Sequence, residues 1–151
     1  MINNMNFQST IVNNKSTIKG QSKIDNTSGV FIDSLELKKR TKEFAHRCVK
    51  LALALPKNVL GGHIKRQLIR CATSVAANYR ATLLSQTKAS FVSKISIVIE
   101  EADESEFWLD FVMDEKLMKR EKVLPLFNEA HELSSIFITT RKTAQKKIKH
   151  K

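Results

Sequence analysis

The chain has 151 residues, the size of one domain, and 42% of them are hydrophobic. Its two cysteines argue against a disulfide framework and favour a reducing compartment. The longest apolar run, residues 51–55, is too short to cross a membrane, and residues 1–10 do not resemble a signal peptide. We therefore expect a cytoplasmic protein that has no membrane segment.

The net charge of +11 is unevenly distributed along the chain. Residues 34–86 carry 11 basic and 2 acidic side chains, a net charge of +9, whereas residues 87–118 carry 3 and 8, a net charge of −5. Residues 119–151 carry 9 and 3, a net charge of +6. Such segregation indicates either pairing between segments of the chain or a polyanionic partner.

Residues 1–33 are rich in Asn, Ser, Thr, Lys and Gln and lack sustained periodicity. Because they cannot bury enough apolar surface to offset chain entropy, we predict a disordered N-terminal arm. Residues 34–148 are predicted to form one helical domain, and residues 149–151 its basic end.

The first helix is predicted at about residues 34–55. Asp33 or Ser34 can cap its N-terminus, and Pro56 ends it because the residue before a proline avoids helical geometry. Its core-facing residues recur at three- and four-residue steps and are Leu37, Thr41, Phe44, Cys48, Leu51 and Leu55.

The other three helices are predicted at about residues 59–82, 87–115 and 120–147. The second helix has the core-facing residues Ile64, Leu68, Cys71, Val75, Asn78 and Thr82. The third has Phe91, Ile95, Val98, Ala102, Ser105, Leu109 and Val112, and the fourth has Leu126, Ala130, Leu133, Phe137, Thr140 and Ala144. These faces repeat every 3.5 residues on average and the connections are short, which predicts an all-α, antiparallel up-and-down four-helix bundle.

Apolar side chains extend beyond these core-facing positions, most clearly in the third helix. The additional residues there are Ile97, Ile99, Phe107, Trp108 and Phe111. A monomeric bundle needs roughly three core positions per heptad on each helix, so the excess predicts a second buried surface. Self-association is the simplest explanation of that surface.

Five segments of the sequence carry a resemblance to a known family. They are residues 37–42 (LKKRTK), 67–81 (QLIRCATSVAANYRA), 88–91 (KASF), 100–104 (EEADE) and 108–109 (WL). Across residues 35–144 the chain resembles the four-helix-bundle proteins encoded by intervening sequences within bacterial 23S ribosomal RNA genes.

The resemblance implies a bundle that assembles as a ring-shaped homopentamer. A related branch, the accessory variability determinant of diversity-generating retroelements, is basic, binds nucleic acid and partners a reverse transcriptase. The resemblance thus adds RNA, DNA, a reverse transcriptase or another protein to the partners to be considered. For the branch that this chain resembles most, biochemical function is essentially unassigned.

A group of polar residues is predicted between the second and third helices, with Arg70 paired to Glu101 or Glu104. Its members are Arg70, Asn78, Arg80, Glu100, Glu101 and Glu104. We interpret the group as a structural network that fixes helix register or a subunit interface, because no nucleophile or base accompanies the carboxylates.

Other candidate sites are weaker. Glu43 and His46 have the Glu-x-x-His spacing of di-iron bundles, but no second copy stands on another helix. Cys48 and Cys71 are interpreted as buried thiols. Residues 61–62 lack the Lys and Ser/Thr of a phosphate loop, which favours flexibility of a loop or of the helix start. We therefore expect no enzyme activity, no metal and no cofactor.

Clusters of basic residues carry the main functional signal. The predicted nucleic-acid-binding residues are Lys38, Lys39, Arg40, Lys42, Arg47, Lys50, Lys65, Arg66, Arg141, Lys142, Lys146 and Lys147. Several copies of so basic a chain would create a positive field that attracts phosphate backbones largely without sequence preference. We predict electrostatic binding of RNA or DNA without catalysis; the alternative is a protein–protein interaction scaffold with no nucleic-acid role.

Overall fold

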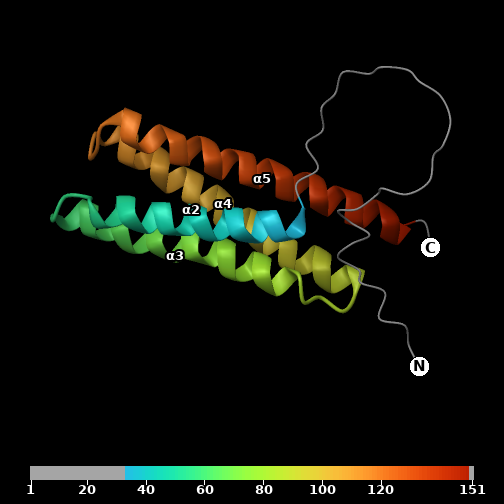
Figure 1. The fold of residues 1–151 in the computed structure, drawn as a ribbon. Coiled ribbons are helices and arrows are strands. Elements are labelled where there is room, and N and C mark those ends of the chain that lie inside the picture. Colours follow the sequence, from blue (N-terminus) through green and yellow to red (C-terminus); the bar gives the residue numbers. More distant parts are fainter. Residues whose placement is uncertain (1–32, 150–151) are drawn as a thin grey trace, which may run out of the picture.

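The computed structural model describes residues 33–149, with side chains as far as residue 146. It contains α2 (Ser34–Leu53), α3 (Val59–Thr82), α4 (Lys88–Asp114) and α5 (Arg120–Lys149), and all regular structure in this range is helical (Figure 1). Within that range, no helix is long and apolar enough to span a membrane. The predicted N-terminal arm lies outside the described residues except for Asp33, as does the basic end beyond Lys149.

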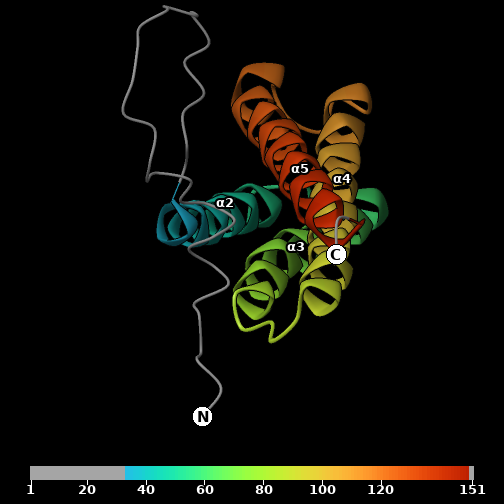
Figure 2. The same ribbon diagram turned by 90° about the vertical axis from the view of Figure 1, so that its right-hand side faces the viewer.

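The all-α prediction is confirmed, and successive helices run antiparallel to one another (Figure 1). Extensive interfaces join α2 to α3, α3 to α4 and α4 to α5, whereas the interface between α2 and α5 is small. Viewed along the bundle, α2 and α4 lie on opposite sides, with α3 and α5 between them (Figure 2). The outward surfaces of α2 and α4 therefore face away from each other.

Side chains that accept backbone hydrogen bonds set the start of two helices. The Asn58 side chain accepts a bond from Gly61 N at 2.7 Å, and the Thr87 side chain accepts one from Ser90 N at 3.1 Å. Both bonds satisfy N–H groups that have no partner within the helix. Asp33 stands at the N-cap position of α2, but its side chain makes no capping hydrogen bond.

Gly61 is required by close packing at the start of α3. A Cβ atom there would lie 2.1 Å from the carbonyl oxygen of Pro56, which belongs to the turn after α2. The neighbouring Gly62 is not constrained in this way, since a Cβ atom there would make only an ordinary van der Waals contact, with a guanidinium nitrogen of Arg66 at 3.9 Å. The prediction of flexibility at residues 61–62 therefore misses the reason for the first glycine, which is the close approach of two backbones.

The predicted core-facing residues are buried throughout the first and third predicted helices. Two positions elsewhere differ, because Asn78 on α3 and Thr140 on α5 are only half-buried. Tyr79 occupies the core beside Asn78 and packs against Phe137, with ring centroids 5.3 Å apart. Its aromatic ring fills more of the space between α3 and α5 than the amide of Asn78 could.

Candidate nucleic-acid interface

The outward side of α2 carries most of the predicted basic residues. Lys39, Lys42, Arg47 and Lys50 are exposed, and Lys38 is half-buried. Helical spacing of three or four residues places lysines on the same side of the helix, turn after turn. α2 therefore presents a row of positive charge to solvent.

The adjoining helix α3 has no acidic residue along its whole length. Arg66 and Arg80 are exposed and Lys65 is half-buried. Arg80 was assigned to the polar network from the sequence, yet it belongs to this basic surface instead. The absence of any carboxylate on the exposed side of α3 is the sequence signal that could have found it.

Together these side chains form a surface that we name the basic face. It consists of Lys38, Lys39, Lys42 and Lys50 of α2 and Lys65, Arg66 and Arg80 of α3. None of the seven forms an ion pair with another side chain that the structure describes. Because α2 and α3 share an extensive interface, the seven positive charges are brought onto neighbouring helices and are free to meet phosphates.

Arg40 does not belong to this surface, although the sequence suggested that it did. Its guanidinium donates to both carboxylate oxygens of Glu129 on α5, at 2.7 and 2.9 Å, and also pairs with Glu132 at 2.9 Å. The hydrogen bonds that Arg40 donates to Glu129 and Glu132 raise its pKa above its usual value. The side chain ties α2 to α5 across their small interface and is engaged within the subunit.

The predicted basic residues of α5 divide into three groups. Lys142 and Lys146 are exposed and free to attract anions, whereas the side chain of Lys147 lies outside the described residues. Arg141 is half-buried and donates to Ser96 Oγ of α4 at 3.3 Å. Its Nε atom is buried and has no hydrogen-bond partner among the described residues. Arg141 thus packs between helices rather than facing solvent.

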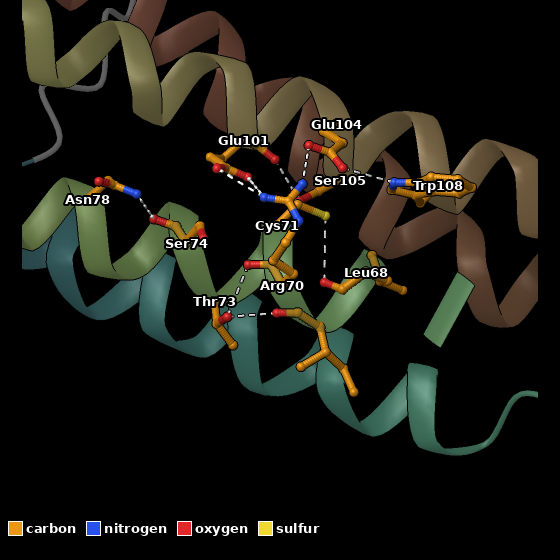
Figure 3. Close-up of polar contacts among 11 residues, drawn as sticks. Leu68, Arg70, Cys71, Thr73, Ser74, Asn78, Glu101, Glu104, Ser105 and Trp108 are labelled. Carbon is orange, nitrogen blue, oxygen red and sulfur yellow. Dashed lines mark hydrogen bonds and ion pairs between the residues drawn. The ribbon is translucent and has the colours of Figure 1, made fainter. Parts of the chain in front are cut away.

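The polar group between α3 and α4 is centred on Arg70 (Figure 3). Arg70 Nη1 pairs with Glu101 at 3.1 Å, and its Nη2 donates to Glu104. The other Glu104 oxygen accepts from Trp108 Nε1 at 3.2 Å, so one carboxylate joins the guanidinium to the indole. The bond from Arg70, followed by that from Trp108, holds the pKa of Glu104 below its usual value. The arrangement orients side chains across the α3–α4 interface.

Three residues predicted for this network lie outside it. Asn78 donates to the carbonyl oxygen of Ser74 in its own helix, at 3.0 Å. Arg80 and Glu100 are exposed, and neither makes an ion pair with a described side chain. The network is therefore an arginine of α3 held by two carboxylates of α4.

The remaining sequence candidates lie in ordinary surroundings. Glu43 and His46 are both exposed on α2, and the described residues contain no group of three or more His, Cys, Asp or Glu side chains able to hold a metal ion. Cys48 and Cys71 are buried, unpaired thiols. Burial raises the pKa of Cys71 to about 11 and that of Cys48 further still, so both thiols are protonated at neutral pH and are poor nucleophiles.

The sequence also matches a family model. Residues 33–139 match the model of the 23S rRNA-intervening sequence protein, which covers well over half of the chain. The chain belongs to this family. A search of curated proteins gives no match. Among solved structures, the chain is similar to a protein of unknown function from the S23 ribosomal protein family of Bacteroides thetaiotaomicron. The two share 29% sequence identity over 72% of this chain and 97% of the other, with a TM-score of 0.65.

The part of the chain that matches the 23S rRNA-intervening sequence protein family contains the whole basic face and both carboxylate-bound arginines, Arg40 and Arg70. It ends before Arg141, Lys142 and Lys146. The family assignment thus covers the surface formed by α2 and α3, and it leaves the last turns of α5 outside.

Proposed function

We propose that this chain is a non-enzymatic, self-assembling bundle that binds RNA or DNA electrostatically through its basic face. The observation that carries the proposal is the charge of α3, which has lysine and arginine but no carboxylate, beside the lysine row of α2. Uncompensated positive charge on two adjacent helices attracts phosphate groups and releases their counterions. Contacts of this kind give affinity without base recognition.

Self-assembly into a homopentameric ring is the second part of the proposal. Large apolar side chains stand exposed on the bundle, among them Leu35 and Leu53 on α2 and Ile97 and Phe107 on α4. Exposed apolar side chains on the outward surfaces of two helices support an interface between copies. Light scattering coupled to size exclusion tests it: a mass of five chains is expected, and a monomer would overturn this part.

Nucleic-acid binding is tested by fluorescence anisotropy with labelled single-stranded RNA and DNA across a salt series. The variant Lys65→Gln/Arg66→Gln/Arg80→Gln removes three charges from α3. The control Lys119→Gln/Arg120→Gln/Lys122→Gln removes three exposed charges from the α4–α5 connection and the start of α5. Both variants lower the net charge equally, so a difference between them reports position rather than total charge.

For the α3 variant, the slope of log affinity against log salt is expected to fall by about 2, because each phosphate contact on a single strand contributes about 0.7. The control should keep nearly the wild-type slope. Equal effects of both variants would show that the basic face has no special role. If wild-type protein does not bind RNA or DNA at moderate salt, the binding proposal is wrong.

A protein-binding scaffold is the second candidate, and one observation favours it. Phe107 is 53% exposed, although it is aromatic and packs against Trp108 and Phe111, with ring centroids 4.9 and 5.9 Å apart. Aromatic side chains that are exposed at the surface and packed against neighbouring rings are typical of protein–protein interfaces. This candidate predicts no salt-sensitive nucleic-acid affinity, and loss of a protein partner when Phe107 is replaced by serine.

A further inference from the structure

Two outward strips of the bundle carry opposite charge together with exposed apolar side chains. The α2 strip consists of Leu35, Lys39, Lys42, His46, Lys50 and Leu53, and all six are exposed. The α4 strip consists of Ile97, Glu100, Asp103, Phe107, Asp110 and Asp114, which are also exposed. Steps of three or four residues keep each strip on one side of its helix.

We infer that the α4 strip of one copy docks against the α2 strip of the next copy of this chain. The inference rests on the proposed self-assembly and specifies its interface. Three lysines and two leucines face four carboxylates, an isoleucine and a phenylalanine, so charge and apolar surface are complementary between the strips. Two α4 strips would instead bring like charges together, and so would two α2 strips.

The charged residues of both strips form no ion pair with the side chains of residues 33–146. Among the described side chains, Glu100, Asp103, Asp110 and Asp114 form no ion pair, and neither do the three lysines of the α2 strip. By contrast, the carboxylates just beside the α4 strip are already occupied, Glu101 and Glu104 by Arg70 and Glu106 by His131. The free carboxylates are therefore those that point away from the bundle.

Phe107 is held in place before any contact with another copy. It packs edge-on against Trp108, whose indole N–H is fixed by Glu104, and Glu104 is itself bound by Arg70. An aromatic side chain that is already ordered loses little conformational freedom on binding, which favours an anchor role. The polar network of α3 and α4 thus supports the apolar centre of the strip from behind.

The positions of the two strips determine what kind of assembly they make. α2 and α4 lie on opposite sides of the bundle, so each copy offers one strip to each of two neighbours (Figure 2). Contacts between unlike surfaces propagate from copy to copy, and they close into a ring when the rotation between copies allows it. α2 and α4 also run in the same direction, so copies around an axis along the bundle would set their strips parallel (Figure 1).

Docking between copies would also reduce the protein surface that is available to nucleic acid. Lys39, Lys42 and Lys50 belong to both the basic face and the α2 strip, so docking would cover them. Arg66 and Arg80 on α3 lie outside both strips and stay available to phosphates. The α3 residues can therefore be changed without touching the proposed contact between copies.

Charge reversal of each strip, separately and together, tests the inference on the full chain. The α4 variant is Glu100→Lys/Asp103→Lys, the α2 variant is Lys39→Glu/Lys42→Glu, and the swap variant carries all four changes. Lys119→Glu/Lys122→Glu is the control, since both lysines are exposed away from the strips. Mass is measured by light scattering, and folding is checked by far-UV circular dichroism and thermal melting.

The α4 and α2 variants are each expected to lose the assembled species at a concentration where wild type is fully assembled. The swap variant should recover the wild-type mass, because the opposite charges then face each other again. The strip pairing is wrong if wild type assembles and the α4 or α2 variant assembles as well. It is also wrong if the swap variant does not recover the wild-type mass. Self-assembly itself would stand in both cases. A monomeric wild type overturns self-assembly itself.

Arg66→Gln/Arg80→Gln separates the interface from nucleic-acid binding. This variant should keep the wild-type mass, because neither residue belongs to a strip. Dissociation of this variant would contradict the inferred interface. A lysine-rich peptide serves as a second probe of the α4 strip. If the α4 variant stays assembled but no longer binds this peptide, the α4 strip binds a different, basic protein and the inferred interface is wrong.

Discussion

Two arginines in this bundle are each bound by a pair of carboxylates three residues apart on a neighbouring helix. Arg40 of α2 holds Glu129 and Glu132 of α5, and Arg70 of α3 holds Glu101 and Glu104 of α4. We name these the Arg40 clamp and the Arg70 clamp. Spacing of three residues places both carboxylates on one side of their helix, within reach of one planar guanidinium.

The surroundings of the two clamps differ, and the difference predicts how much each clamp contributes to the stability of the fold. The Arg40 side chain is 22% exposed and binds Glu129 in a bidentate manner, whereas Arg70 is 49% exposed. Moreover, the α2–α5 interface is small and the α3–α4 interface is extensive. Removing one partner of an ion pair costs more when the charge left behind is shielded from water. We expect this cost to be greater still where the two helices share only a small interface. The same chemistry should therefore matter more at Arg40.

Replacing Arg40 with methionine should have the largest effect. Arg40→Met keeps an unbranched side chain of similar helix propensity but leaves the largely buried carboxylate of Glu129 unpaired. We expect the free energy of unfolding to fall by about 2 kcal/mol, less than for a fully buried pair because the clamp is partly hydrated. Urea denaturation at fixed protein concentration measures it. Arg47→Met, an exposed site on the same helix, is the control and should change stability by less than about 0.5 kcal/mol.

Arg40→Lys keeps the charge and removes the planar fork. A lysine ammonium cannot bind both oxygens of Glu129 and reach Glu132 in the same geometry. We expect the free energy of unfolding to fall by about 1 kcal/mol, which places Arg40→Lys between wild type and Arg40→Met in stability. If Arg40→Lys were as stable as wild type, the positive charge alone would matter at this clamp, and the planar geometry of the guanidinium would not.

Arg70→Met should cost less than Arg40→Met, at most about 1 kcal/mol, because exposed ion pairs contribute little. Arg80→Met on the same helix is its matched control, since Arg80 is exposed and forms no ion pair with a described side chain. The two clamp variants are compared under identical denaturation conditions. Equal losses at Arg40 and Arg70 would break the proposed dependence on burial and interface size.

The pH dependence of the Arg70 clamp should give the smallest effect. The pKa of Glu104 is lowered, first by its bond to Arg70, so the folded state favours the charged carboxylate. Its contribution is fully present above the unfolded pKa, about 4.3, and is lost as pH falls through the lowered folded pKa. Stability curves of wild type and Glu104→Gln should therefore converge below about pH 4. A gap that stays constant down to pH 3 would contradict this role of Glu104.

The sequence predicted the Arg70 clamp and missed the Arg40 clamp for a physical reason. Arg70 and Glu101 lie 31 residues apart on helices joined by a short turn, so their facing sides follow from helical periodicity and antiparallel pairing. Arg40 and Glu129 lie 89 residues apart, and their contact depends on how the first and last helices meet. On sequence alone, Arg40 reads as one member of a run of basic residues.

Other differences from the sequence-based predictions have the same origin. The assignment of Arg80 to a polar network failed because the carboxylates of α4 face Arg70, ten residues earlier on α3. Gly61 was read as flexible, although its role is to let α3 approach the Pro56 carbonyl group. In both cases the deciding partner belongs to another element of the bundle.

Helical periodicity alone determined where the four helices run and most of the residues that they bury, because a side chain's direction repeats every 3.6 residues whatever lies opposite. Only the tertiary structure decided which basic side chains are free and which are bound, since that depends on the helix standing beside each one. Lys39 and Arg40 are adjacent in the sequence, but the 100° turn between them sends one to solvent and the other to Glu129.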